Sequence, residues 1–325
     1  MPARVDPEVY ELYLKGRYFW VMRTEEATQK AIELFQQAID KDPTYAAAYS
    51  GLADCYSSFG MTFDVGGLAP RESEPKALAA ATKAVALDDS SAEAHNSVAF
   101  IKLNFDWDWV QSEREFKRSI ELNPGWANEH HWYAHHLMSS GRISEAETES
   151  LRALELDPLN AIMNTHLGWH YYFARQYDKS LEQLRKTIEL VPNYGLAFWY
   201  SGWAYEQKGL YSDALRDLQR AKELLKTNVS VDADIGHLYA VSGNRAGAER
   251  VLRDLKELST KKYVNAFEIA LIYVGLGDKD NAFEWLDKAY QQRSDMLVYL
   301  NVDPRLDVIR HEPRFIGLVK KVAPP

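Results

Sequence analysis

The sequence predicts an all-α solenoid built from repeated helix hairpins, and two observations lead to that prediction. Three near-copies of one phrase, ELNP, ELDP and ELVP, end at Pro124, Pro158 and Pro192, which are spaced 34 residues apart. A fixed period of this length with helical patterning is typical of an array of helix–turn–helix units. The chain has 325 residues, more than the roughly 250–300 at which one hydrophobic core stops growing. An array is therefore favoured over a single globular core.

Composition and charge narrow the classes of partner. The net charge is −9, and basic residues are clustered only as short pairs, so we expect no direct nucleic-acid partner, since that affinity comes from clustered Lys and Arg. No window approaches the ~18 apolar residues of a membrane span, and the first residues lack the apolar run of a signal peptide. The single cysteine, Cys55, cannot form an internal disulfide and is expected to be a buried small hydrophobe. We expect a cytoplasmic protein with no membrane partner.

Eight units can be aligned on the 34-residue period. In each unit the first helix carries a small residue where the second helix of the hairpin must approach closely, while larger residues fill the space around that contact. In chain order these small residues are Gly16, Ala53, Ala99, Ala134, Gly168, Gly202, Gly236 and Ala270. The pattern predicts sixteen helices arranged as eight hairpins.

The second unit contains an insertion, residues 59–75. Its glycines and its proline at residue 70 predict a loop. Four apolar side chains, Phe59, Met61, Phe63 and Leu68, are many for a solvated loop. We expect the loop to pack on a neighbouring unit, with a lid over a binding surface as the lesser alternative.

Two capping boxes are predicted at the starts of second helices. Asp108 with Gln111 three residues later would cap the helix of the third unit, and Ser144 with Glu147 that of the fourth.

The repeat pattern stops after Ser294. Two proline-led segments follow, at residues 304–309 and 313–319, and proline in the first turn is a helix-start signal. We expect capping helices that cover the apolar end of the stack, as terminal units of a repeat array must. The predicted organisation is one domain, with the solenoid at 1–294 and capping helices at 295–325.

These spacings and small residues resemble the tetratricopeptide repeat (TPR) family along nearly the whole chain. Four phrases, YLKGRY at 13–18, FDWDW at 105–109, VDPRL at 302–306 and EPRF at 312–315, also resemble the repeat regions of bacterial signalling proteins, where repeats follow a DNA-binding, kinase or cyclase domain. The resemblance implies a right-handed α-solenoid. It also implies a concave wall built from the first helix of each repeat.

The positions that the resemblance assigns to that wall are aromatic and histidine-rich in repeats four to seven. Exposed apolar patches rimmed by polar groups commonly mark binding sites, so we expect a partner protein or peptide here. The alternative is that these aromatic side chains are structural. The predicted partner-binding residues are His131, His135, Met138, Trp169, Tyr172, Phe173, Trp199, Trp203, Glu206 and His237.

The histidines also suggest a metal site. His131 and His135 stand four residues apart on one helix, and His166 and His170 repeat that spacing. The repeat register directs the first pair to the groove and the second pair to the packing between repeats. A catalytic zinc site needs a third ligand and a general base, and there is no His-Glu-x-x-His motif, so we expect protonatable groove residues, no metal and no cofactor. Whether the histidines bind metal stays open.

The function predicted is a non-catalytic protein-interaction scaffold, because no nucleophile, base and pocket can be assembled from the sequence. The alternative is a ligand- or partner-sensing module of a bacterial transcriptional regulator or kinase. The sequence names neither the partner nor the oligomeric state.

Overall fold

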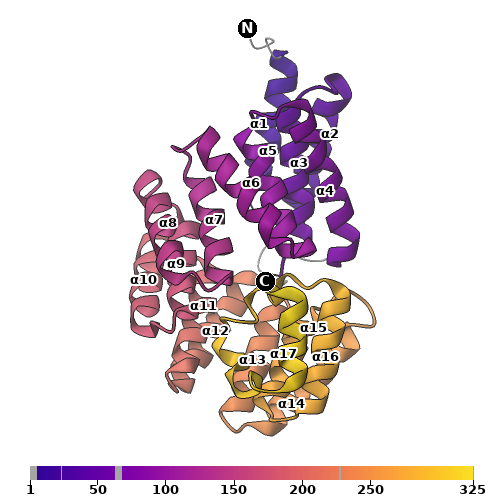
Figure 1. Cartoon of the computed structure of the whole chain (residues 1–325). Coiled ribbons are helices and arrows are strands. Elements are labelled where there is room, and N and C mark those ends of the chain that lie inside the picture. Colours follow the sequence, from indigo (N-terminus) through magenta and orange to yellow (C-terminus); the bar gives the residue numbers. More distant parts are fainter. Residues whose placement is uncertain (1–5, 23, 63–67, 227, 325) are drawn as a thin grey trace. The chain divides into compact units, whose positions relative to one another are not determined.

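The computed structural model describes residues 6–22, 24–62, 68–226 and 228–324. Helices and turns account for this part of the chain, which has no strand (Figure 1). The chain forms two compact units, Met1–Gly125 and Trp126–Pro325, here named unit 1 and unit 2. None of the described helices is both long enough and apolar enough to cross a membrane.

Unit 1 consists of three successive helix hairpins, and the first helix of the third hairpin continues into a short π-helix. The elements are α1 (Pro7–Trp20), α2 (Glu25–Lys41), α3 (Ala46–Gly60), α4 (Pro70–Leu87), α5 (Ala92–Ile101), η1 (Lys102–Asp106) and α6 (Trp109–Leu122). Their apolar faces form one core around Phe35, in which Cys55 is fully buried, as the sequence predicts.

The insertion of unit 1 is shorter than predicted. Helix α3 extends through Phe59 and α4 begins at Pro70, so only the residues between these helices form the link. Phe59 is buried and Met61 packs on the core of unit 1. Phe63 lies outside the described residues.

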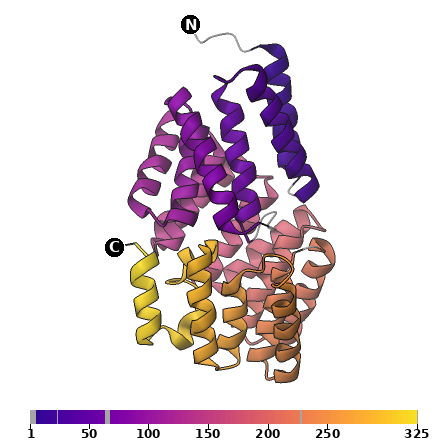
Figure 2. The same ribbon diagram turned by 90° about the vertical axis from the view of Figure 1, so that its right-hand side faces the viewer.

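Unit 2 contains five further hairpins and a C-terminal segment (Figure 2). The hairpin helices are α7 (Ala127–Ser139), α8 (Ile143–Leu156), α9 (Ala161–Phe173), α10 (Tyr177–Leu190), α11 (Gly195–Gln207), α12 (Tyr211–Leu225), α13 (Ser230–Val241), α14 (Arg245–Leu258), α15 (Ala266–Gly275) and α16 (Lys279–Gln292).

Glycine sets the distance between the two helices of a hairpin, as the period predicts. A Cβ atom on Gly168 of α9 would lie 2.6 Å from Cγ of Leu184 on α10. At Gly202 of α11 the same atom would lie 2.6 Å from Cγ of Leu218 on α12. The leucine of the second helix thus occupies the volume that a side chain at the glycine would need.

The turns inside the hairpins of unit 2 repeat one backbone conformation every 34 residues. A left-handed residue, with φ between 71° and 87°, closes the first helix at Gly141, Gly209, Gly243 and Gly277. Arg175 holds the equivalent place with φ 60°. A left-handed backbone costs a residue with a Cβ atom about 1–2 kcal/mol, so Arg175 is the strained member of the series.

Of the two predicted capping boxes, the one at Asp108 is half formed, because the backbone N–H of Asp108 donates to the carbonyl of Lys102 and not to Gln111. The Asp108 side chain accepts a hydrogen bond from the backbone N–H of Gln111 at 3.0 Å and caps α6. The Ser144 prediction is wrong, because α8 begins at Ile143 and its cap residue is Arg142. Ser144 therefore lies inside the first turn of α8, where the backbone no longer needs its hydroxyl.

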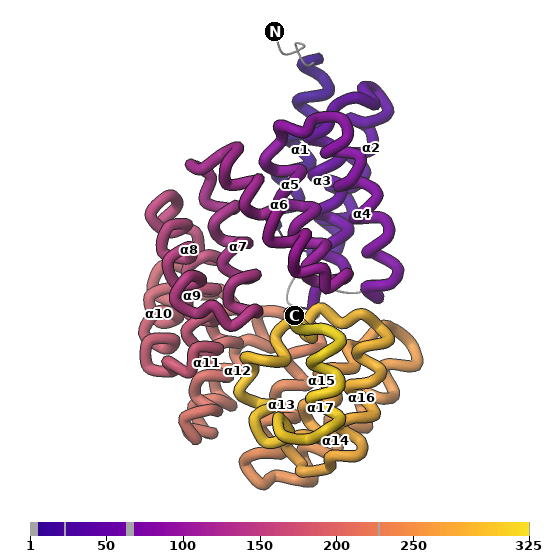
Figure 3. The backbone as a smooth tube through the Cα atoms, in the orientation of Figure 1, coloured from indigo at the N-terminus to yellow at the C-terminus, as the bar shows by residue number. Residues whose placement is uncertain are grey.

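The C-terminal segment follows α16 as two 3-10 helices and one α-helix, whose path the backbone tube in Figure 3 shows. These elements are η2 (Asp295–Tyr299), η3 (Pro304–Ile309) and α17 (Pro313–Val322). Helix α17 packs on α16, and η3 packs on α15. Side chains of η2 and η3 also reach α7, α9, α11 and α13.

Candidate functional site

The ten predicted wall residues lie on α7, α9, α11 and α13, and every one of them is buried. Their exposed fractions lie between 0 and 7%. The expectation of an open aromatic and histidine wall therefore needs correction, because other atoms of the chain cover it. Whether these side chains bind a partner remains a prediction. The residues are His131, His135, Met138, Trp169, Tyr172, Phe173, Trp199, Trp203, Glu206 and His237.

Tyr299 of η2 covers the aromatic part of this wall. Its ring stacks on Phe173 with 4.8 Å between centroids and 6° between planes, and lies 4.9 Å from the ring of Trp169. Trp169 in turn stacks on Tyr200 of the next repeat at 5.2 Å. The Tyr299 hydroxyl lies 3.4 Å from Nδ1 of His135. One tyrosine of the C-terminal segment thus joins an aromatic layer built by two successive repeats.

Arg305 of η3 covers the second part of the wall. Its guanidinium carbon lies 4.0 Å from the ring centroid of Trp203, and Nη1 donates to Oδ1 of Asp234 at 2.8 Å. The other oxygen of Asp234 accepts from the indole N–H groups of Trp199, at 2.5 Å, and Trp203, at 2.7 Å. Asp234 is therefore the junction at which two wall tryptophans and the C-terminal arginine meet.

Arg175 holds the outer edge of the segment. Its guanidinium donates to both carboxylate oxygens of Asp307, at 2.8 and 2.9 Å, and to the backbone carbonyl of Val302 at 3.1 Å. This is the residue that takes the strained left-handed turn in place of glycine. Arginine at this turn therefore supplies contacts to the segment that glycine could not make.

Buried charge concentrates beneath η3. Asp303 accepts from the guanidinium of Arg305, and together with Asp234 it holds the pKa of that group above its usual value despite burial. Burial raises the pKa of Asp234, an effect that Arg305 partly offsets. Glu268 of α15 has a pKa well above its usual value because it is buried and faces Asp234. Two wall residues form a further pair, His237 Nδ1 and the Glu206 carboxylate, 3.1 Å apart.

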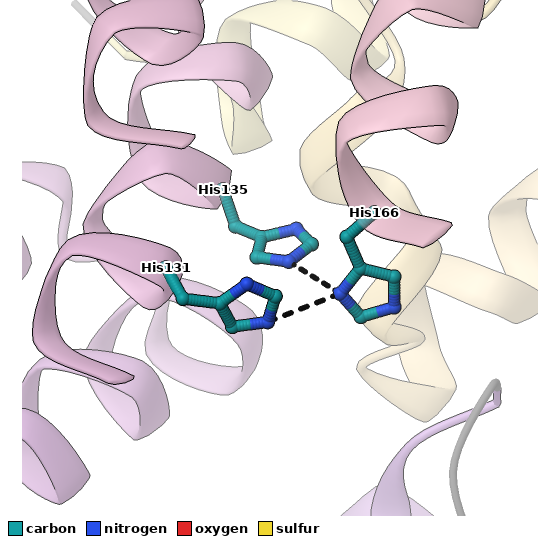
Figure 4. A group of neighbouring side chains, drawn as sticks. All are labelled: His131, His135 and His166. Carbon is teal, nitrogen blue, oxygen red and sulfur yellow. Dashed lines mark hydrogen bonds between the residues drawn. The ribbon is translucent and has the colours of Figure 1, made fainter. Parts of the chain in front are cut away.

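Histidines of α7 and α9 form a second feature of the wall (Figure 4). His135 Nε2 lies 2.9 Å from Nδ1 of His166, and His131 Nε2 lies 3.1 Å from the same atom. His170 continues the cluster, with Nε2 3.3 Å from Nδ1 of His135. The prediction that the α7 pair faces the groove while the α9 pair lies in the packing between repeats is therefore wrong, because the structure brings all four imidazoles together.

Two of these imidazoles are held neutral by burial. Burial, followed by the neighbouring histidines, lowers the pKa of His135 well below its usual value. Burial lowers the pKa of His170 to about 3. The expectation of protonatable groove histidines is therefore wrong for His135. Three ring nitrogens, His131 Nε2, His135 Nε2 and His166 Nδ1, lie within 4.8 Å of one another and could hold a metal ion.

Comparison with known proteins identifies the repeats. Three family profiles described as tetratricopeptide repeat match residues 23–62, 165–228 and 266–295. The chain contains tetratricopeptide repeats. No curated protein sequence matches it.

Solved structures of repeat proteins align with the chain at low sequence identity, and one of them shares its fold. The structure of the Cut9–Hcn1 hetero-tetramer of APC/C aligns with a TM-score of 0.63 at 17% identity, over 96% of this chain and 55% of that one. YrrB, described as a TPR protein with an unusual peptide-binding site, aligns with a TM-score of 0.38 at 21% identity, over 58% of this chain and 91% of that one. Pseudomonas aeruginosa PilF gives 0.47 at 19% identity, over 67% and 93%.

Unit 1 of the TPR protein contains a smaller ion network. Arg17 Nη1 donates to Asp54 at 2.8 Å, and Nη2 lies 3.5 Å from Glu93. The hydroxyl of Ser97 also donates to Asp54, at 2.8 Å, and Tyr13 donates to Glu93. Because each carboxylate has several donors, this network is a satisfied polar contact between repeats.

Sequence reasoning missed the residues that cover the wall, namely Tyr299, Asp303 and Arg305, and their buried partners Asp234 and Glu268. One signal was available. Asp234 and Glu268 occupy the same repeat position, 34 residues apart, on helices whose neighbouring positions are apolar. This is the repeat position of His166, which the register assigns to the packing between repeats, and two acidic residues there indicate a buried cation. Arg305 lies in the phrase VDPRL, which the repeat pattern leaves unexplained.

Proposed function

We propose that the concave wall of unit 2 binds a partner polypeptide in the place that residues 295–310 occupy in the structure. The repeats support a protein–protein interaction scaffold for the chain as a whole. The finer assignment, a non-catalytic scaffold whose partner contacts the ten wall residues, rests on the wall's complementarity to a polypeptide. A sensing role in a bacterial regulator or kinase rests on the resemblance of four phrases alone and stays a prediction.

One observation carries this proposal. The wall receives a short irregular segment through two side chains, Tyr299 between aromatic rings and Arg305 between Trp203 and Asp234. Aromatic and arginine side chains in desolvated pockets are the usual anchors of protein interfaces. A partner with an aromatic residue and an arginine at a similar spacing has the chemistry to compete for the wall.

The chain's own segment sets the threshold for such a partner. A tethered segment competes at an effective concentration in the millimolar range for short flexible connections. A partner must therefore bind more tightly than the segment or meet the chain when the segment is displaced. We expect weak binding in trans to the native chain and tighter binding when the segment's anchors are removed.

The test uses the full chain and a labelled peptide with the sequence of residues 295–310, measured by fluorescence anisotropy. We expect a Tyr299→Ala chain to bind the peptide at least about ten times more tightly than the native chain, because the competing segment is weakened. Truncating Trp169 or Trp203 is a poorer test, because removing a buried indole costs about 3–5 kcal/mol and confounds binding with folding.

Peptide variants provide the controls. A peptide with Arg305→Ala should lose binding, whereas one with Val308→Ala should bind like the parent, because Val308 is 61% exposed in the structure. If the folded Tyr299→Ala chain binds the parent peptide no better than a scrambled one, the wall does not accept polypeptides in trans and the proposal is wrong.

A further inference from the structure

We propose that His131, His135 and His166 bind a transition-metal ion of the Zn²⁺ class. The potential ligand atoms are Nε2 of His131, Nε2 of His135 and Nδ1 of His166, all within 4.8 Å of one another. Imidazole nitrogen is a preferred ligand of Zn²⁺ and other borderline-soft divalent ions. No prediction or resemblance assigns an ion to this place.

Two neighbouring helices of the backbone bring these ligands together. Residues four apart on a helix share one face, so His131 and His135 project together from α7. The adjacent helix α9 supplies His166 from the opposite side (Figure 4). Zn–N bonds of 2.0–2.1 Å in a tetrahedral arrangement separate the nitrogens by roughly 3.3 Å. The two measured separations from His166 Nδ1, 2.9 and 3.1 Å, are close to that value.

Two hydrogen-bond contacts compete for one nitrogen of this cluster, Nδ1 of His166. In a neutral imidazole one ring nitrogen donates and the other accepts through a single lone pair. Nδ1 of His166 faces both His131 Nε2 and His135 Nε2, so as an acceptor it would have to share its lone pair between two N–H groups. As a donor it could bond to only one of the two facing nitrogens. An ion between the three nitrogens removes this conflict, because each lone pair then points at the ion.

The surroundings supply the support that a ligating histidine requires. Such a histidine usually donates its second ring N–H to a fixed acceptor. With Nε2 of His135 on the ion, its Nδ1–H faces Nε2 of His170 at 3.3 Å. His170 Nδ1–H then donates to the Ser150 hydroxyl oxygen at 2.9 Å, and that hydroxyl donates to the carbonyl of Ala146 at 2.8 Å. Every donor in this chain of bonds has an acceptor.

The site is enclosed by aromatic rings and contributes no negative charge. Trp132 and Trp169 lie 5.1 and 5.4 Å from the ring of His135. No carboxylate joins the three nitrogens in the part of the chain that the structure describes. Three protein ligands leave one position of a tetrahedral ion for water or a small anion.

The experiment measures binding of Zn²⁺ alone to the full chain after chelator treatment, by competition with a chromophoric chelator. Because the histidines are buried, the titration is made on native chain and on chain refolded with the ion. We expect one ion per chain. We expect the His166→Gln chain, which lacks a ligand, to bind Zn²⁺ more than about 100 times more weakly than the native chain. The Ser150→Ala chain lacks only a residue that orients a ligand, and we expect it to bind Zn²⁺ about 10–100 times more weakly.

His95→Gln is the matched control. His95 is also buried and bonded, to Glu115 at 2.6 Å, but lies in unit 1 outside the cluster, so this variant should bind Zn²⁺ as the native chain does. Circular dichroism shows which variants are folded, and His131→Gln replaces His166→Gln if the latter unfolds. The proposal is overturned if neither native nor refolded chain binds one ion, or if a folded ligand variant binds as tightly as the native chain.

Discussion

The guanidinium of Arg305 lies over the ring of Trp203, and both side chains bond to one carboxylate, that of Asp234. The guanidinium carbon lies 4.0 Å from the indole centroid, and both side chains donate to the carboxylate of Asp234. Arg305 comes from the C-terminal segment, whereas Trp203 and Asp234 belong to two consecutive repeats. The order of the C-terminal segment and the packing of the repeats therefore depend on each other, and substitutions in either part test this dependence.

Replacing Arg305 by alanine should destabilise unit 2 strongly. The substitution leaves Asp234 and Asp303 buried without their cation, and breaking one partner of a buried ion pair typically costs about 3–5 kcal/mol. Urea denaturation followed by circular dichroism measures the change. Arg314→Ala, an exposed arginine on α17 with an ion pair to Asp287, is the control and should cost at most about 1 kcal/mol. Equal effects of the two substitutions would show that the buried junction has no special role.

Replacing Arg175 by glycine should loosen the C-terminal segment without lowering the stability of the repeats. Glycine relieves the left-handed strain at φ 60°, about 1–2 kcal/mol, while the contacts to Asp307 and Val302 are lost. We expect unchanged or slightly higher stability together with faster tryptic cleavage after Arg310. Arg175→Ala loses the same contacts and keeps the strain, so it should be less stable than Arg175→Gly. The reverse order would contradict the role assigned to this turn.

Adding a methyl group at Gly168 should force two helices apart. The new Cβ atom would lie 2.6 Å from Cγ of Leu184, and overpacking of this kind typically costs about 1–3 kcal/mol. Thermal unfolding measures the loss. Gly125→Ala is the control, because its nearest neighbour would be 3.9 Å away, and its melting temperature should stay within a degree or two of the native value. A harmless Gly168→Ala would mean that α9 and α10 can separate at little cost.

The sequence predicted the hairpins because their determinants are local. Gly168 and Leu184 occupy fixed places in a 34-residue period, so their contact could be anticipated from spacing alone. The resemblance placed Trp169, Trp203 and His135 on the inner wall, and in the structure all three side chains are buried. What spacing could not reveal is that residues outside the period return to that face. Tyr299 and His135 are 164 positions apart, and the pairing depends on where the backbone turns after α16.

The histidine cluster shows the same limit within the repeats. His135 and His166 were assigned to different faces, because an ideal register takes no account of how far a side chain reaches across the gap between two first helices. An imidazole on α9 spans that gap and lies 2.9 Å from one on α7. Fixed positions in the period therefore predicted which helices pack together, and not which polar atoms meet between them.

Replacing Glu268 by glutamine should make stability less dependent on pH. Burial and the neighbouring carboxylates of Asp234 and Asp295 raise the pKa of Glu268 well above 4.5, although Arg305 opposes the shift. Below pH 4.5 this carboxyl is protonated in both the folded and the unfolded chain. As the pH rises from there to the folded pKa, the unfolded chain ionises first, so the native chain loses stability by up to about 1.4 kcal/mol per pH unit.

Glutamine cannot ionise, so the Glu268→Gln chain lacks this loss. Its free energy of unfolding relative to the native chain should therefore rise between pH 5 and pH 8, as measured by urea denaturation at each pH. Glu257→Gln provides the control, because Glu257 is exposed and paired with Lys261 four residues away, and its curve should run parallel to the native one. Parallel curves for Glu268→Gln as well would mean that this carboxyl is ionised in the folded chain, with the charge of Arg305 outweighing its burial.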